Sequence, residues 1–317
     1  MRDLNILAPV NTMESAIAVI DAGCNEIYLS GDKGLFKTYS FSGRGKIGEN
    51  GICVANNFEN IRKIVGYAHE HSVKVNFTAN IQYFTKANIN GKSLEKYYLE
   101  YVENAIAAGV DSIIVGDIGL LKLLAKQNYG VSIHASIFFK TINREQVLYL
   151  KENGADRVTL SYQITADEIE LLSRDKIMEY EVVGYAGCSF FNGACNFLHG
   201  YGEGVIDNFN PGISCKSYYK VAGKEDEVRL FDAEASCAVC SLKKLEAMNV
   251  DALKLVGRDK DYRVFLEIIK YYKDVLHSET GNLDLESKPI WWERLFCRNH
   301  SCKYKSQNSN YAFTIGR

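Results

Sequence analysis

Short apolar runs alternate with longer amphipathic segments along most of the chain. Near-continuous apolar strands are typical of a parallel sheet that is covered on both faces, and strand–helix alternation indicates right-handed βα units. Eight such runs can be counted, which predicts a closed (β/α)8 TIM-barrel-like domain. The expected strands are residues 4–9, 25–30, 73–78, 111–117, 131–136, 156–161, 178–185 and 251–257.

The segments between these runs carry helix signals. Residues 12–22 and 94–108 both end in Ala-Gly, and a glycine just past the last turn is the usual helix stop. Residues 58–71 place apolar side chains at helical spacing, and Asp117 precedes Ile-Gly-Leu-Leu as an N-cap. A repeated phrase, AGC-NEIYL, AGV-DSIIV, NGA-DRVTL and MNV-DALKL, indicates one structural unit used several times within the βα architecture.

Two long connections interrupt the alternation, at 31–57 and 187–236. Loops of this length inside a compact domain are usually functional or disordered, and both follow the carboxyl ends of strands, where barrel active sites are built. We therefore expect a barrel domain over 1–277 that carries a cysteine-rich region at 187–240. Residues 278–317 are expected to form a linker and a small C-terminal extension.

Composition limits the function classes. The 317 residues are 47% hydrophobic with a formal charge of −2, so net charge does not favour non-specific nucleic-acid binding. The N-terminus lacks the long apolar core of a signal peptide, and no run of eighteen apolar residues occurs. A cytoplasmic protein without a membrane span is the expectation, and in a reducing compartment clustered cysteines indicate metal rather than disulfides.

Five of the nine cysteines fall between residues 181 and 240: Cys188, Cys195, Cys215, Cys237 and Cys240. They lie among Gly, Asn, Ser and Lys, where a buried structural thiol gains little, whereas Cys24 and Cys53 have surroundings more typical of structural thiols. Clustered thiolates bind iron–sulfur clusters or soft metals, and four thiolates bind zinc equally well. The spacing does not separate these two cofactors.

Polar residues at strand ends are the candidates for catalysis or substrate contact. His134, Asn76 and Tyr185 stand near the ends of expected strands, and such side chains point into a barrel mouth. Scaffolding is the alternative role. The G-x-G-x-x-G at residues 43–48 lacks the flanking strand and helix of a nucleotide site, which favours a glycine-rich loop. Neither G-x-S-x-G nor H-E-x-x-H occurs.

Several of these segments together resemble peptidase family U32. They are LAPVNTMESAIAVIDAGCNEIYLSGD, AHEHSVKVNFTAN, GVDSIIVGDIGLL, VSIHAS, the GC-x4-G-x-C core at 187–195 and VDALKLVGR at 250–258. The resemblance implies a TIM-barrel-like domain that holds a [4Fe-4S] cluster on four cysteines. It further implies either a collagenase-type peptidase or an oxygen-independent hydroxylation protein that acts on tRNA, ribosomal RNA or ubiquinone precursors.

Carried over by position, the resemblance makes Cys188, Cys195 and Cys215 cluster ligands. Ungapped comparison back from Gly257-Arg258 gives Cys237 as the fourth ligand, and Cys240 is chemically equivalent. The family's E-x-F-x2-G is altered, because Glu181 is followed by Val-Val-Gly-Tyr, one residue short. This departure indicates a divergent branch of the family.

Three functions follow as hypotheses. The first is a redox enzyme or subunit for oxygen-independent hydroxylation of an RNA base or a small aromatic substrate. The second is a peptidase, and the third is a non-catalytic subunit that forms a heterodimer with a paralogue through aromatic residues such as Trp291 and Trp292. Whether Cys297 and Cys302 form a second metal site with His300, or only pack, stays open.

Overall fold

The computed structural model describes most of the expected barrel and a small part of the remaining chain. Side chains are described for residues 4–31, 57–80, 91–185, 237–257 and 261–278 and for Trp292 and Tyr304; two-residue strands are also described at 46–47, 53–54, 88–89, 219–220 and 227–228. Of the five clustered cysteines, Cys237 and Cys240 therefore belong to the described residues.

Eight parallel strands close into a barrel in the order β1-β14-β11-β10-β9-β8-β5-β2. All eight coincide with runs expected from the sequence, so the prediction of a TIM-barrel-like fold is confirmed. The strands are β1 (Asn5–Pro9), β2 (Glu26–Leu29), β5 (Lys74–Thr78), β8 (Ser112–Val115), β9 (Ser132–Ala135), β10 (Arg157–Thr159), β11 (Glu179–Tyr185) and β14 (Ala252–Leu255).

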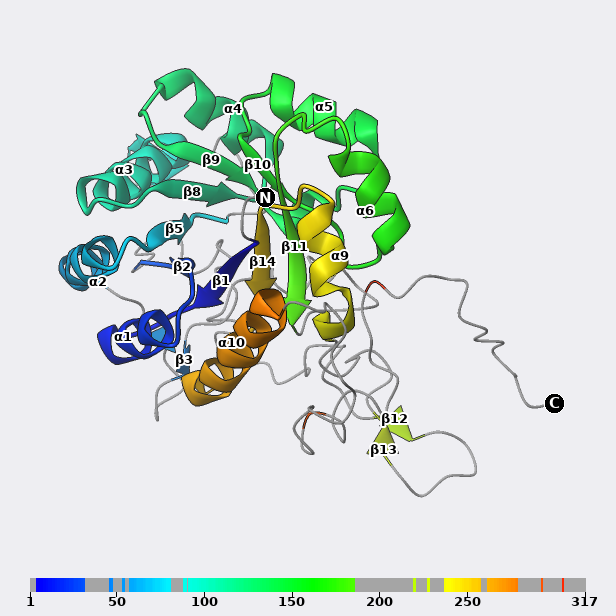
Figure 1. The fold of residues 1–317 in the computed structure, drawn as a ribbon. Coiled ribbons are helices and arrows are strands. Elements are labelled where there is room, and N and C mark those ends of the chain that lie inside the picture. Colours follow the sequence, from blue (N-terminus) through cyan, green and yellow to red (C-terminus); the bar gives the residue numbers. More distant parts are fainter. Residues whose placement is uncertain are drawn as a thin grey trace.

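Helices surround the strands, as Figure 1 shows. The expected N-cap at Asp117 is confirmed, since its carboxylate accepts the Leu120 N–H at 3.0 Å. The apolar stripe expected over 58–71 faces inward on α2. The helices are α1 (Met13–Asp21), α2 (Phe58–Glu70), α3 (Leu94–Ala107), α4 (Ile118–Gln127), α5 (Arg144–Glu152), α6 (Ala166–Ser173), α9 (Leu242–Ala247) and α10 (Tyr262–His277).

The repeated phrase of the sequence is a unit that joins each of four helix ends to the strand after it. An Asx side chain at the start of the new strand accepts a backbone N–H from the preceding barrel strand, which satisfies a donor at the barrel's amino end. Three of these units reverse the chain at a glycine with φ between +95° and +99°, where a side chain would be strained. The four bonds are Ile6 N to Asn25 Oδ1 (3.0 Å), Val75 N to Asp111 Oδ2 (2.7 Å), Ile133 N to Asp156 Oδ2 (2.9 Å) and Tyr180 N to Asp251 Oδ2 (2.7 Å).

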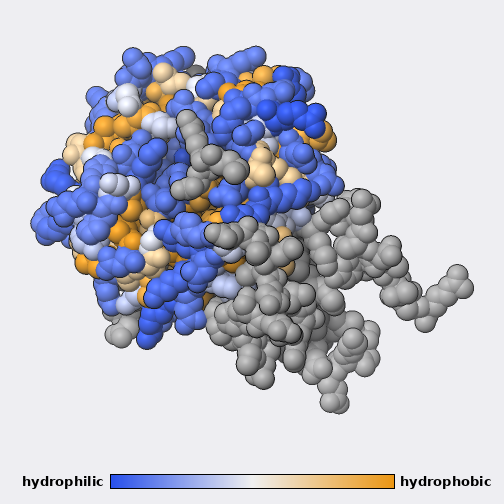
Figure 2. Space-filling model, viewed as in Figure 1, coloured by the Kyte–Doolittle hydropathy of each residue, from blue (hydrophilic) through white to orange (hydrophobic). Residues whose placement is uncertain are grey.

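The apolar core lies mainly between the strands and the helices. Inside the barrel, Leu7, Tyr28 and Ile114 form a small separate apolar cluster, and the layer beside it is polar and charged. The outer face seen in Figure 2 is largely hydrophilic with scattered apolar residues. In the described part of the chain, no helix combines the length and the hydropathy that crossing a membrane requires.

Two residues from the expected C-terminal extension pack against the barrel. Trp292 is fully buried, with its ring centroid 4.9 Å from that of Tyr271 and 5.8 Å from that of Tyr272 on α10. The Tyr304 hydroxyl donates to the Val183 carbonyl of β11 at 2.8 Å. The domain boundary at residue 277 stays a prediction.

Candidate functional site

A buried ion pair crosses the inside of the barrel. Arg157 on β10 donates from Nη1 to Glu26 Oε2 at 2.7 Å and from Nη2 to Glu26 Oε1 at 3.0 Å. β2 and β10 lie four strands apart in the eight-stranded order, so the pair spans the full width of the barrel. Such a two-point contact fixes the geometry of both groups as well as their charge.

Further charged groups extend this pair along β11 and β14. Arg157 also contacts Glu179, while Glu181 accepts from Thr159 Oγ1 at 2.8 Å and from Lys254 Nζ at 2.9 Å. The Lys254 ammonium also lies 4.5 Å from the centre of the Tyr28 ring. Glu181, the acidic residue of the altered family motif, is therefore held inside the barrel by a hydroxyl and an ammonium.

These contacts decide which groups are charged. Burial by itself would raise the pKa of Glu26, but the hydrogen bonds and charge of Arg157, with help from Asn76 and Asn5, lower it below its ordinary value. Burial lowers the pKa of His134 well below its usual range, and the nearby charges of Arg157 and Lys254 act in the same direction. The barrel thus holds an ionised Glu26 and a neutral His134.

Asn76 and His134, both predicted as site residues, are brought together by Ser112. The Ser112 hydroxyl donates to Asn76 Oδ1 at 2.5 Å and lies 3.4 Å from His134 Nδ1. Asn76 Nδ2 donates to Glu26 Oε2 at 3.0 Å, which joins this chain to the ion pair. Both predicted residues are almost fully buried, at 1% and 4% exposure.

The two residues lie one layer deeper than the sequence suggested. Thr78 and Ser136 follow them by two positions and therefore point to the same side of the strand, nearer its carboxyl end. Just beyond β5, Asn80 Nδ2 donates to Ser136 Oγ at 3.1 Å. The mouth is thus lined by residues that the sequence analysis missed, although they stand in the same NFTAN and HAS phrases. Catalytic roles for Asn76 and His134 stay predictions.

Two polar atoms of this mouth have no hydrogen-bond partner in the described structure. They are Thr78 Oγ1 and Asn80 Oδ1, and both are buried. A Cβ on Gly116 would lie 3.3 Å from Asn80 Oδ1 and 2.8 Å from the Phe138 ring, so glycine leaves room for the amide. Buried polar atoms are normally satisfied, and their lack of a partner here is what a site for a polar ligand would show.

A third feature lies at the carboxyl end of β11. Tyr185 forms an isolated antiparallel bridge with Cys237, which is buried, while Cys240 on the short 3-10 helix η4 (Val239–Ser241) is exposed. Trp292 Nε1 lies 3.2 Å from Cys237 Sγ and donates to it. The predicted residue Tyr185 therefore adjoins one predicted ligand, and burial, followed by the nearby Cys237, raises its pKa.

The other predicted ligands, Cys188, Cys195 and Cys215, lie outside the described residues. Among the residues that the structure does describe, no three His, Cys, Asp or Glu side chains converge on a possible metal position. Cys24 lies in the core with its pKa raised to about 12 by burial, which agrees with a structural thiol. The predictions also stay untested for four residues whose side chains lie outside the described part of the chain: Cys53, Cys297, His300 and Cys302.

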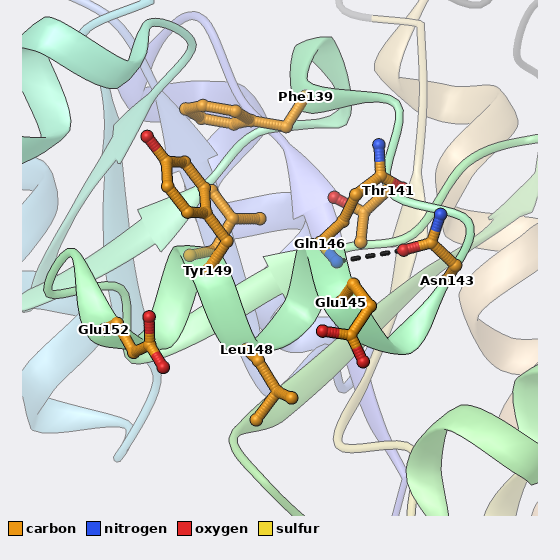
Figure 3. A pocket seen from close by; sticks show the side chains of 9 residues that line it. Phe139, Thr141, Asn143, Glu145, Gln146, Leu148, Tyr149 and Glu152 are labelled. Carbon is orange, nitrogen blue, oxygen red and sulfur yellow. Dashed lines mark hydrogen bonds between the residues drawn. The ribbon is translucent and has the colours of Figure 1, made fainter.

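An open groove of about 590 Å³ lies beside α5 and is drawn in Figure 3. The Phe139 ring and the Tyr149 ring face each other across it, and Asn143 at its edge accepts the Gln146 N–H at 2.9 Å. The described residues that line it include two carboxylates, Glu145 and Glu152, and no cation. This charge disfavours a phosphate-bearing ligand, so the groove is a poorer candidate than the barrel mouth.

The fold and the strand-end site define a TIM-barrel protein with polar groups gathered at the carboxyl ends of its strands. The model of peptidase family U32 matches residues 11–304, so the chain belongs to that family. Among solved structures, the U32 peptidase Mk0906 superimposes with a TM-score of 0.53 at 14% identity, covering 81% of this chain and 94% of that one. The match confirms the fold.

Curated relatives fall into two functional groups. The chain is 25% identical to tRNA hydroxylation protein P1 of Bacillus subtilis, over 86% of its own length and 62% of the relative's. It is 23% identical to the 23S rRNA 5-hydroxycytidine C2501 synthase of Escherichia coli, over 88% and 41%. It is also 24% identical to a collagenase of Porphyromonas gingivalis, over 93% and 71%. The chain thus spans about half the length of the hydroxylation proteins that it matches.

Proposed function

We propose that this protein is an iron–sulfur member of family U32 that takes part in oxygen-independent hydroxylation of an RNA base. The observation that carries the proposal is the combination of five clustered cysteines with a family whose curated relatives include tRNA and rRNA hydroxylation proteins. A small aromatic substrate is the alternative within the same reaction class.

One described cysteine, Cys237, lies at the carboxyl end of β11, which supports a cluster there. Cys237 adjoins Tyr185, and Cys188 follows Tyr185 by three residues, which can span no more than about 11 Å. This closeness in sequence supports the proposal that Cys188 and Cys237 bind the same group. Cys188, Cys195 and Cys215 would hold the group, with Cys237 or Cys240 as the fourth thiolate. When bound, a cluster with four thiolate ligands supplies one-electron transfer.

The chain's own residues would bind and orient the substrate at the mouth. Asn80 Oδ1 is an acceptor that no donor among the described residues meets, and the Thr78 hydroxyl can donate or accept. A nucleobase edge presents both kinds of group, and single-stranded RNA bases are read in this way. Beneath them, the Arg157–Glu26 pair holds the strands in place and supplies no free charge to the substrate.

The peptidase hypothesis finds less support in the described geometry. Ser112 and His134 form the serine–histidine contact described above, but the serine hydroxyl donates to Asn76 rather than to the imidazole. A nucleophilic serine requires the opposite arrangement, with histidine as the proton acceptor. Both residues also lie inside the barrel with little exposure, where a peptide bond could not reach them.

Comparison of modified nucleosides tests the proposal. The gene is deleted in its native host, and nucleosides from purified tRNA and rRNA are measured by mass spectrometry. We expect one hydroxylated nucleoside to disappear and to return when the wild-type gene is supplied. C188A should fail to restore it, whereas C24A, which removes a buried thiol outside the proposed cluster, should restore it. Unchanged nucleosides in both RNA classes would refute the RNA substrate, and cleavage of gelatin by the purified protein would favour the peptidase.

A further inference from the structure

The groove beside α5 combines two aromatic rings with two carboxylates on the outer surface of the barrel. None of the described residues that line it is assigned above to the substrate or to the cluster. The Phe139 ring comes from the 3-10 helix η2 (Ile137–Phe139), and the Tyr149 ring comes from α5. Figure 3 shows the two rings facing each other across the groove. A flat group can therefore be held between them.

The charge of the groove is negative. Glu145 and Glu152 stand one helical turn before and one turn after Tyr149, so all three lie on one face of α5. Neither carboxylate is paired with a basic side chain in the part of the chain that the structure describes, and the adjacent Arg144 is paired with Asp175 at 3.3 Å. A ligand in the groove thus meets two uncompensated negative charges.

A buried oxygen of the groove also lacks a partner. Thr141 lines the groove and is fully buried, and its Oγ1 has no hydrogen-bond partner in the described structure. Buried hydroxyl groups are normally hydrogen-bonded, because an unsatisfied one costs free energy. An N–H donor on a ligand would satisfy this oxygen. This observation is independent of the carboxylates, and it too points to a ligand that donates hydrogen bonds.

A guanidinium group has all the properties that these features require. It is planar, it is always positively charged, and it carries five N–H donors and no acceptor. It stacks on aromatic faces and forms charge-assisted hydrogen bonds with carboxylates. An alkylammonium has the charge without the planar shape, and a phosphate would meet like charge. Arginine therefore supplies the chemistry that the groove fits best.

The surroundings of the groove favour an arginine carried by a protein over a free small cation. Small-molecule sites usually enclose most of the ligand, whereas this groove is open. Ile142, which stands between the lining residues Thr141 and Asn143, is 53% exposed, and Tyr149 is 51% exposed. A protein partner would cover these apolar surfaces, and a free amine would not. Tyrosine and arginine are also the residues that most often dominate binding energy at interfaces.

Charge argues against a second copy of this chain as the occupant. A two-fold dimer built on this surface would place the same patch on both sides of the interface. Glu145 and Glu152 would then face their own counterparts, and like charges across an interface are unfavourable. The partner is thus expected to be a different protein.

We infer that the groove beside α5 is a docking site for an arginine side chain of a partner protein. The guanidinium lies between the Phe139 and Tyr149 rings, and Glu145 and Glu152 attract it from either side of Tyr149. This inference does not depend on the proposed function, because it requires neither a cluster nor an RNA substrate.

Binding of small probes to the whole chain tests the chemistry of the groove. N-acetyl-arginine amide is titrated into ¹⁵N-labelled protein and followed by NMR. N-acetyl-citrulline amide serves as the neutral probe of the same shape, and N-acetyl-lysine amide as the cation without a planar head. We expect shifts at Thr141 and along α5 that are strongest with the arginine probe. Equal affinity for the citrulline probe or for the lysine probe, or no shift at α5, would overturn the inference.

Variants of the lining residues identify the groups that bind the probe. Y149L should weaken binding of the arginine probe by about two- to fivefold, the usual size of an exposed cation–π contact. E145Q and E152Q remove one charge each and should weaken it by up to about fivefold. E95Q is the matched control, because Glu95 is likewise an acidic residue in the first turn of its helix, α3. Unchanged binding in Y149L, E145Q and E152Q, or equal weakening in E95Q, would contradict the site.

Crosslinking from the edge of the groove tests the partner. The photoreactive residue p-benzoylphenylalanine replaces Ile142 in the whole chain, which is expressed in its native host and irradiated. We expect a crosslink to an arginine-containing segment of another protein, and its loss when E145Q and E152Q are added or when that arginine is replaced by glutamine. A crosslink only to RNA, to a second copy or within the same chain, or no crosslink at all, would overturn the assignment of a partner protein.

Discussion

Arg157 and Glu26 pair across the inside of the barrel from opposite strands, 131 residues apart in sequence, at 2.7 and 3.0 Å. Their side chains are 3% and 1% exposed. A TIM barrel is ordinarily filled by branched apolar side chains. Here an ion pair occupies that position, so the barrel's integrity depends on matched charges.

Replacing Arg157 by methionine should therefore greatly lower the stability of the fold. Loss of one partner leaves a buried, uncompensated carboxylate, which typically costs about 3–5 kcal/mol. R157M should lower the unfolding free energy by this amount in urea denaturation. As a control, R144M removes the exposed pair with Asp175 and should change stability by less than about 1 kcal/mol. Adding E26Q to R157M should restore part of the loss, and no restoration would contradict an uncompensated charge as the cause.

His134 should make the fold less stable in mild acid. Its pKa in the folded protein is held well below its usual range, whereas in the unfolded chain it titrates near about 6.5. The unfolded state then binds more protons, so stability is full above that pH and falls below it, by up to about 1.4 kcal/mol per pH unit. Unfolding free energies of wild type and H134Q, measured between about pH 7.5 and pH 5, should converge as the pH falls.

A constant difference between the two proteins over that range would contradict a buried neutral histidine. Titration of Glu26 does not contribute to the difference between wild type and H134Q in this pH range. Its folded pKa is lowered, so the stability it contributes is present above its unfolded value of about 4.3 and is lost only at more acidic pH.

The repeated Asx unit gives a prediction at Asp156. D156A removes the acceptor of the Ile133 N–H and leaves a backbone donor at the strand's amino end unsatisfied, which should cost about 1–3 kcal/mol. D156N keeps a carbonyl oxygen in the same place and should recover most of that loss. Thermal unfolding followed by circular dichroism measures both, and equal destabilisation by the two variants would argue against the bond.

Thr78 should show opposite effects on stability and activity. Its buried hydroxyl has no partner in the described structure, so T78V removes an unsatisfied polar atom while keeping the side chain's shape. We expect unchanged or slightly higher stability, by up to about 1 kcal/mol, together with weaker nucleoside hydroxylation in the host. Full activity in T78V would show that the hydroxyl does not contact the substrate.

The sequence predicted the barrel well, because each strand is covered on both faces and reads as an apolar run. It did not predict the charged interior. Glu26, Arg157 and Glu179 each stand near the start of such a run and look like ordinary strand-end charges. Their convergence depends on barrel closure, which brings residues more than a hundred positions apart to one point. The one sequence signal for a charged interior was the presence of charged residues within otherwise apolar runs.

The depth of the predicted site residues inside the barrel could not be read from the sequence. Asn76 and His134 point inward as expected, yet Thr78 and Ser136, two positions further along, lie nearer the mouth. The sequence also could not show that Cys237 is buried against Trp292 while Cys240 is exposed, because burial depends on packing.

The most direct test of the account is the iron and acid-labile sulfide content of wild-type protein purified without oxygen, together with its visible absorbance. The account predicts a brown protein with about four iron and four sulfide per chain, the content of one [4Fe-4S] cluster. A colourless protein that binds one zinc per chain would contradict it.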